Sequence, residues 1–149
     1  MSSEKKDYEL GVLLKKNIIL NRAPMSKEEV IKDLGRIFYE GGYTTEKYTD
    51  AMLEKEKSFN TAIGNSLGIP HGIESMRGEI KHSGLAVFTF PEGTDWGDGE
   101  KVKLVIGVAA IGNDHMATLA RIADACESEE KVDEILKMDV DSVYELFKA

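Results

Sequence analysis

Residues 102–110, Val-Lys-Leu-Val-Ile-Gly-Val-Ala-Ala, form a long and nearly continuous apolar run. A run of this kind lacks the alternation of apolar and polar residues that marks a strand with one wet face. It is typical of a strand that is buried on both faces, at the centre of a sheet. The run therefore predicts a fold built around a sheet whose central strand is dry on both sides.

Segments with helical and with strand character alternate along the chain. Ser26-Lys-Glu-Glu29 is a capping-box pattern, in which each of the two end side chains bonds the backbone of the other residue, and it predicts the start of a helix. Apolar residues at helical spacing continue to Gly41-Gly42, a pair typical of a helix end. The alternation predicts an α/β fold. Further helices are expected at 45–57, at 115–125, after a cap at Ser128 and at 142–147, and further strands at 13–20, 67–69 and 84–90.

Residues 91–93, Pro-Glu-Gly, predict a turn after the strand at 84–90. Residues 95–100, which hold the only tryptophan, are expected to form a loop before the central strand. A turn as short as 91–93 can join only neighbouring strands, so the sheet can be mixed, with both parallel and antiparallel pairs.

Length and composition bound the class of protein. The chain has 149 residues, the size of one ordinary domain, so a single domain over residues 1–149 is expected. Apolar residues at 42% and charged residues at 31% are typical of soluble globular proteins. The sequence has neither an apolar run near the ~20 residues that a membrane span requires nor a secretory leader. A cytoplasmic location is therefore expected.

Charge and cysteine content exclude several kinds of partner and chemistry. The net charge is −8 and the sequence has no basic cluster, which argues against binding to nucleic acid or to anionic lipid. The single thiol, Cys126, cannot form an internal disulfide. It falls in register with apolar residues at helical spacing, so we expect it to pack in the core and not to react.

The most unusual stretch is residues 60–72, Asn-Thr-Ala-Ile-Gly-Asn-Ser-Leu-Gly-Ile-Pro-His-Gly. Pro70 restricts its own φ and favours an extended residue before it, so the strand at 67–69 is expected to deliver His71 to its end. Gly72 then lets the chain turn sharply. Small residues in the stretch let backbone amides approach a ligand and let a partner protein come close. The stretch suggests an anion or phosphoryl site, and a surface or core histidine without chemistry is the alternative.

Residues 48–57 and 60–72 resemble the phosphorylation-site region of the mannitol/fructose-type enzyme IIA domains of the sugar phosphotransferase system, and the mannitol members most closely. This resemblance implies a mixed, mainly five-stranded sheet flanked by helices. Later segments also match in the family's order, so the resemblance covers nearly the whole chain: Val-Phe-Thr-Phe-Pro-Glu-Gly at 87–93, Leu-Val-Ile-Gly-Val-Ala-Ala at 104–110 and Gly-Asn-Asp-His-Met at 112–116.

The resemblance implies that the protein is a phosphocarrier. His71 would accept a phosphoryl group from the phosphocarrier protein HPr and pass it to a cysteine of the IIB domain of the mannitol-specific IICB permease, which drives uptake and phosphorylation of mannitol. A neutral imidazole nitrogen is a good nucleophile near neutral pH, and the other nitrogen fixes the tautomer if it donates to a backbone carbonyl. The intermediate would be a tele-phosphohistidine. Neither a metal nor a cofactor is expected.

Two more residues would support the phosphoryl group. By resemblance His115, expected in the first turn of the helix after the central strand, would stabilise it; the alternative is a solvent-facing histidine near a helix cap. Lys55 stands sixteen residues before His71, where family members commonly have arginine. An ammonium would hold phosphate oxygens with looser geometry than a guanidinium, and the alternative is a solvated residue on a helix face.

Asn65 precedes the strand that leads to His71, at a position where the mannitol members of the family it resembles often have glutamate and other members asparagine. Its amide could orient the imidazole ring or bind a phosphoryl oxygen, and a plain turn residue is the alternative.

Two other function classes are alternatives to the phosphocarrier. In the first, phosphorylation of His71 on the same fold only switches binding to a target protein, and closeness to the mannitol motifs argues against it. In the second, a metal-dependent hydrolase would use His71, His82 and His115. The separations of these histidines, eleven and thirty-three residues, match no metal-ligand motif.

Overall fold

The computed structural model describes residues 12–112 and 114–148, without the side chains of residues 114 and 115. Its centre is a five-stranded sheet with the order β1-β4-β5-β3-β2. The pairs β1–β4 and β3–β5 are parallel, and the pairs β4–β5 and β2–β3 are antiparallel. The predicted α/β fold with a mixed sheet is therefore confirmed. The strands are β1 (Ile18–Ile19), β2 (Ala62–Gly64), β3 (Leu67–Gly68), β4 (Gly84–Gly97) and β5 (Glu100–Ala109).

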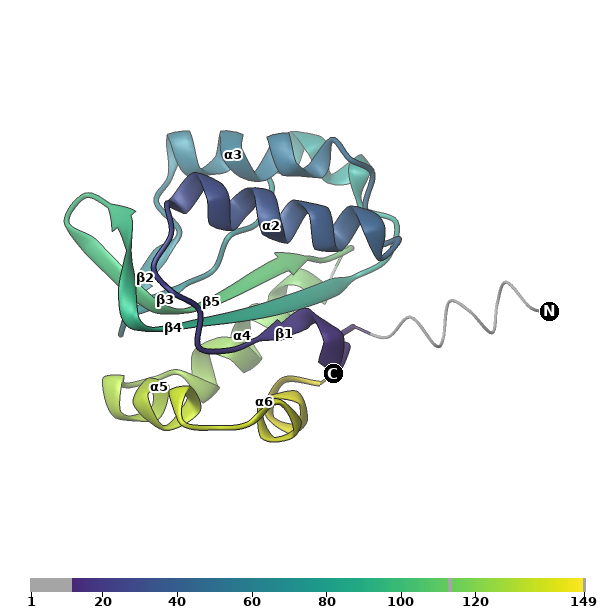
Figure 1. The fold of residues 1–149 in the computed structure, drawn as a ribbon. Helices are drawn as coiled ribbons and strands as arrows, with labels where there is room; N and C mark the ends of the chain where they lie inside the picture. The colour runs from purple at the N-terminus through teal and green to yellow at the C-terminus, as the bar shows by residue number, and fades with distance from the viewer. Residues whose placement is uncertain (1–11, 113, 149) are drawn as a thin grey trace.

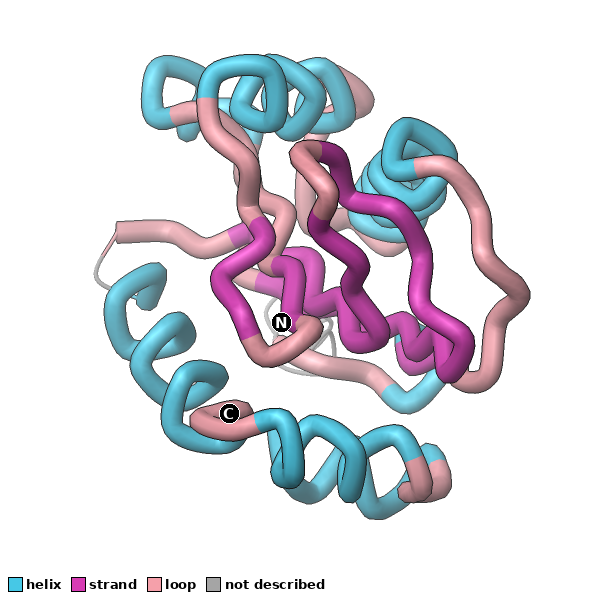
Figure 2. The backbone as a smooth tube through the Cα atoms, turned by 90° about the vertical axis from the view of Figure 1, so that its left-hand side faces the viewer, coloured by secondary structure: helices cyan, strands magenta, loops and turns pink. Residues whose placement is uncertain are grey.

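Helices cover both faces of the sheet (Figure 1). The helices α2 (Lys27–Glu40) and α3 (Tyr48–Ser58) lie on one face. The helices α4 (Asp114–Ala125), α5 (Glu129–Leu136) and α6 (Val140–Phe147) lie on the other. Seen from the side, the strands run between these two helical layers (Figure 2). Two 3-10 segments, η1 (Lys15–Asn17) and η2 (Glu74–Glu79), complete the described elements.

The strand β5 is buried on both faces, as its apolar run predicts. Leu104, Ile106 and Val108 join the core cluster that contains residues of α4, α5 and α6. Val105 and Ala109, which point the other way, join the cluster formed with α2 and α3. Successive side chains of a strand point to opposite faces of the sheet, so this one apolar run contributes to both core clusters.

The predicted helix starts and ends follow from local chemistry. The Ser26 hydroxyl accepts from the Glu29 amide at 3.1 Å, and the Glu29 carboxylate accepts from the Ser26 amide at 3.3 Å, which confirms the capping box. The helix α2 ends at Gly41, and Gly42 has a φ of +83°, which glycine adopts without strain. Ser128 caps α5 as predicted, by accepting from the Lys131 amide.

The prediction of a turn at 91–93 and a loop at 95–100 is wrong. The strand β4 continues to Gly97, and the tight turn lies at residues 98–99. Thr89 pairs with Leu104 and Thr94 with Val102, so four residues of β4 face one residue of β5. Pro91 lacks an amide hydrogen, and a bulge that leaves residues outside the ladder accommodates it.

Trp96 is fully buried in β4, contrary to its predicted place in a loop. Its indole donates to Thr61 Oγ1 at 3.2 Å, and its carbonyl accepts from Lys27 Nζ and Asn60 Nδ2. These partners come from α2 and from the segment before β2, so contacts distant in the sequence bury the residue.

The expected strand at 13–20 is also much shorter in the structure. Residues 15–17 form η1, and only Ile18 and Ile19 pair with β4, opposite Val87 and Phe88.

Cys126 is buried in the core as predicted, and burial raises the pKa of its thiol to about 11, so it is protonated near neutral pH. None of the helices in the described part of the chain has the length and apolar character to span a bilayer.

Candidate functional site

His71 lies just beyond the end of β3, beside the last residues of β5. Leu67 and Gly68 pair with Leu104 and Val105. Past the strand, the Pro70 carbonyl accepts from the Val108 amide at 2.9 Å, and His71 forms an isolated parallel bridge with Val108. The predicted delivery of His71 to a strand end is confirmed. Its side chain is half-buried, so it is both held and accessible.

The imidazole of His71 has one defined tautomer in this arrangement. Its Nδ1 atom lies 2.8 Å from the backbone carbonyl oxygen of Ile69. A carbonyl oxygen only accepts hydrogen bonds, so a neutral ring must carry its proton on Nδ1 and its lone pair on Nε2. Nε2 is the tele nitrogen. The geometry is therefore the one that nucleophilic attack by Nε2 requires.

Tyr48 ties the turn after His71 to α3 and β5. Its hydroxyl donates to the Val108 carbonyl at 2.9 Å and accepts from the Gly72 amide at 2.9 Å. Burial raises the pKa of Tyr48 to about 12, while the Gly72 bond acts in the opposite direction, so the phenol stays neutral and can donate. A Cβ atom on Gly72 would lie 2.6 Å from Tyr48 Cε1, so only glycine fits there.

The backbone amides that follow His71 already have partners within the fold. The Gly72 amide donates to Tyr48, and the Ile73 amide donates to the Ala51 carbonyl at 3.2 Å. The sequence suggested that amides of this stretch could approach a ligand. These two amides are paired within the fold, so they are not free to bind an anion at the site.

A cavity of about 220 Å³ opens beside His71. It brings together His71 and Lys55, two of the predicted site residues. The Lys55 ammonium lies 4.9 Å from the centre of the exposed Phe59 ring. Arg77 also contributes to the wall, although no sequence signal marked it as functional. The full lining is Tyr48, Lys55, His71, Gly72, Ile73, Glu74, Arg77, Ile80 and Ala110.

Asn65 lies away from this cavity. It occupies the turn between β2 and β3 with a φ of +56°, and its amide donates to the Cys126 carbonyl at 3.2 Å. Asn65 precedes β3 and His71 follows it, so the two residues lie at opposite ends of the strand. The structure therefore favours the turn interpretation over a contact with the His71 ring.

His115 is the second residue of α4, close after the end of β5, as the sequence predicts for its backbone. Its side chain lies outside the described residues. Ala110, the residue after β5, lines the cavity, so the chain leaves the site only a few residues before α4 begins.

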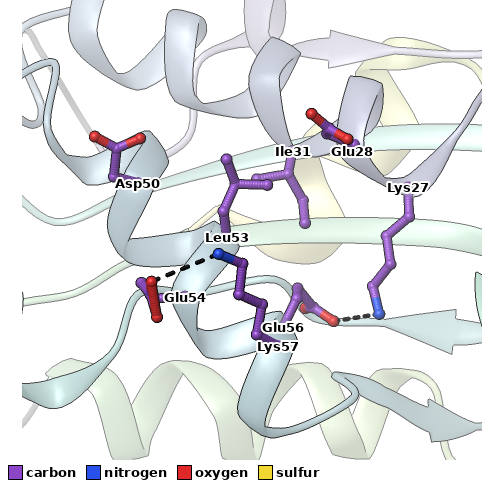
Figure 3. Close-up of a pocket in the computed structure, with 8 residues that line it drawn as sticks. All are labelled: Lys27, Glu28, Ile31, Asp50, Leu53, Glu54, Glu56 and Lys57. Atoms are coloured by element: carbon purple, nitrogen blue, oxygen red, sulfur yellow. Dashed lines mark ion pairs between the residues drawn. The ribbon is translucent and has the colours of Figure 1, made fainter.

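A larger hollow of about 620 Å³ lies between α2 and α3 (Figure 3). It shares no lining residue with the His71 cavity. Its wall holds two ion pairs, Lys27–Glu56 at 2.6 Å and Glu54–Lys57 at 3.7 Å. The chemistry expected of a phosphoryl site is at the smaller cavity, and this hollow reflects the packing of two helices.

The Tyr48 contacts yield a stability prediction. Replacing Tyr48 by Phe leaves the buried Gly72 amide and Val108 carbonyl without the hydroxyl, so the free energy of unfolding should fall by about 2 kcal/mol. Urea denaturation measures the change. Tyr39→Phe, which alters an exposed tyrosine, is the control and should leave the midpoint unchanged. Equal midpoints for all three proteins would show that the Tyr48 hydroxyl is replaceable by water.

Comparison with known proteins adds a family match over almost the whole chain. The family described as phosphoenolpyruvate-dependent sugar phosphotransferase system, EIIA 2, matches residues 12–149. The mannitol-specific phosphotransferase enzyme IIA component of Bacillus subtilis (strain 168) is 41% identical over 127 residues, which are 85% of this chain and 89% of that protein.

Two solved structures from Escherichia coli are also similar. The crystal structure of IIA mannitol has a TM-score of 0.79 and 33% identity, with 88% of this chain and 95% of that chain covered. The complex of enzyme IIAMTL with phosphorylated enzyme IIBMTL contains a chain that matches with a TM-score of 0.81 and 32% identity, over 88% of this chain and 93% of that chain.

Proposed function

We propose that this chain, which belongs to the EIIA 2 family of the phosphoenolpyruvate-dependent sugar phosphotransferase system, is the phosphocarrier that serves mannitol uptake. His71 accepts a phosphoryl group from HPr and passes it to the IIB domain of the mannitol permease. Two observations carry the assignment to His71. Its Nδ1 is committed to a backbone carbonyl, and the residue lines a cavity together with a lysine.

The transfer consists of two balanced displacements at phosphorus. In the first, the Nε2 lone pair of His71 attacks the phosphoryl group of phospho-HPr, and the P–N bond to HPr breaks as the new P–N bond forms. In the second, a cysteine thiolate of the IIB domain attacks, and the electron pair of the broken P–N bond returns to Nε2. Phosphoryl transfer asks the protein mainly for positioning and for stabilisation of negative charge.

Lys55 and His115 are proposed to stabilise that charge. Lys55 lines the cavity, so its ammonium can be attracted to phosphoryl oxygens on His71. His115 stands near the N-terminus of α4, where the helix dipole favours an anion. A ring nitrogen of His115 that donates to the phosphoryl group would align it without accepting it.

Apolar side chains near the cavity support docking of protein partners. Phe59, beneath the Lys55 ammonium, and Ile111, directly after the cavity residue Ala110, are both exposed. Met116, on the first turn of α4, is exposed as well. HPr and the IIB domain would each cover such side chains when they approach His71. The likeness to the IIAMTL chain of a complex with phosphorylated IIBMTL supports the second partner.

The proposed role also has consequences for the cellular location and the domain organisation of the protein. HPr and the IIB domain must both reach His71, so we propose a cytoplasmic location and a single EIIA 2 domain over residues 1–149. The polyol would be selected by the membrane permease.

Reconstitution tests the proposal. Phosphoenolpyruvate, enzyme I, HPr, this protein and membranes that carry a mannitol IICB permease should together form mannitol 1-phosphate. Omitting this protein or HPr should abolish product. If the protein is phosphorylated on His71 but yields no sugar phosphate with any such membrane, the regulatory alternative is correct and the transport role is not.

A further inference from the structure

We propose that Arg77 is a second phosphoryl-binding residue, whose guanidinium binds the phosphoryl group on His71 together with Lys55. The inference rests on the proposed function and adds a residue that the sequence pattern did not assign. Arg77 follows His71 by six residues and belongs to η2. It lines the same cavity of about 220 Å³ as His71 and Lys55.

The size of the cavity brings these side chains within reach of one another. At about 220 Å³ the cavity is smaller than the about 300–1,000 Å³ of typical small-molecule pockets. A long, flexible arginine at the wall of so small a space can reach a phosphoryl group on the imidazole. Lys55 approaches from α3 and Arg77 from η2, so the two cations are supplied by separate elements.

The present partner of Arg77 holds it weakly. Arg77 Nη1 lies 3.8 Å from Glu74 Oε1, and the two side chains are 50% and 87% exposed. An exposed pair at this distance is screened by water and contributes little. A phosphoryl group carries about two negative charges at neutral pH, so it should displace Glu74 from the guanidinium.

The backbone amides directly after His71 do not supply positive charge to a phosphoryl group. The Gly72 and Ile73 amides donate to Tyr48 and to the Ala51 carbonyl. They therefore cannot form the anion nest that small residues near His71 suggested. Among the described residues of the cavity wall, the lysine and arginine cations are Lys55 and Arg77.

The two cations differ in what they can do. The Lys55 ammonium is a compact charge that lies above the Phe59 ring. A guanidinium presents a planar fork that binds two phosphate oxygens at once and fixes their orientation. Arg77 therefore supplies the geometric control of an in-line transfer, which Lys55 alone cannot supply.

The test compares Arg77→Gln and Arg77→Lys with the wild type. Lys57→Gln is the matched control, because Lys57 also sits in an exposed pair with a glutamate three residues away but lines the other hollow. Stopped-flow transfer from phospho-HPr at saturating HPr should be about 10- to 100-fold slower for Arg77→Gln, and Arg77→Lys should recover part of the loss. Lys57→Gln should transfer at the wild-type rate.

A second readout reports the contact itself. In a ³¹P NMR titration of the phosphorylated protein, loss of a neighbouring cation should raise the pKa of the phosphoryl group in Arg77→Gln but not in Lys57→Gln. Normal labelling of His71 with unchanged rates and an unchanged titration in Arg77→Gln would overturn the role of Arg77 and leave the proposed function standing. A change confined to the KM for HPr would also overturn it, by assigning Arg77 to docking. Absence of label on His71 in the wild type would overturn both.

Discussion

The His71→Ala protein should fold and take up no phosphoryl group from phospho-HPr. The imidazole is half-buried, and its Nδ1 bonds the backbone carbonyl of Ile69, only two residues away, so its removal should disturb the core little. The nucleophile is lost completely, since no other atom at that position can form a P–N bond. Intact-protein mass spectrometry after incubation with phosphoenolpyruvate, enzyme I and HPr measures uptake, and circular dichroism checks the fold.

His82→Ala is the control for this experiment. It removes another histidine of the same connection between β3 and β4 and should be labelled like the wild type, with a bond that is labile in acid and stable in base. Label on the His71→Ala protein would contradict the assignment. If that label were found on His115, the acceptor and the stabilising residue would have to be exchanged.

Elements whose signals are local were predicted well from the sequence. The capping box of α2 involves atoms only three residues apart, so the residues that encode it are also the residues that form it. The apolar run at 102–110 predicted a central strand because burial on both faces leaves no place for polar side chains. Pro70 and Gly72 fixed the surroundings of His71 in the same local way, by restricting and releasing the backbone.

Features that depend on distant contacts were not predicted. Trp96 was expected in a loop because turn-forming residues surround it, but Lys27, Asn60 and Thr61 satisfy its polar groups and bury it. The sequence predicts that the strand ends before Pro91. In the structure Pro91 lies in a bulge of β4, and the pairing with β5 resumes at Thr94.

In the candidate site, too, local features are predicted from the sequence and features that depend on distant contacts are not. The sequence predicts His71, Lys55 and Asn65 at the site, and of these the cavity brings together His71 and Lys55, whereas Asn65 bonds the Cys126 carbonyl. An extended strand separates residues that are close in number, and Asn65 and His71 are on either side of β3. No signal in the sequence indicates that Arg77 lines this cavity. Its place in the cavity depends on how η2 returns beside α3, and the six-residue spacing from His71 matches no motif.

Breaking the ion pair between Lys27 and Glu56 should have the largest effect on stability. The Glu56 side chain is 6% exposed and lies 2.6 Å from Lys27 Nζ (Figure 3). The same ammonium donates to the Trp96 carbonyl at 3.0 Å. Glu56 accepts from the Thr61 amide and hydroxyl as well. Lys27→Met would leave a buried carboxylate without its counter-charge, so the free energy of unfolding should fall by about 3–5 kcal/mol.

Removing the carboxylate instead of the ammonium should lower the free energy of unfolding by less. In Glu56→Gln the amide keeps hydrogen-bonding capacity, and Lys27, at 23% exposed, can turn its ammonium toward water. Lys27→Met with Glu56→Gln should therefore be more stable than Lys27→Met alone, because no buried charge is left unpaired.

The neighbouring pair supplies a matched control for these variants. Lys57 and Glu54 line the same hollow but are 75% and 54% exposed, so Lys57→Met should change stability by less than about 1 kcal/mol. Guanidinium denaturation gives all four values. Equal losses for Lys27→Met and Lys57→Met would contradict the prediction and show that burial does not strengthen the first pair.

Lys55 directly precedes Glu56 on α3, so Lys27→Met should also slow phosphorylation of His71, as a loosened helix end no longer holds the Lys55 ammonium at the cavity.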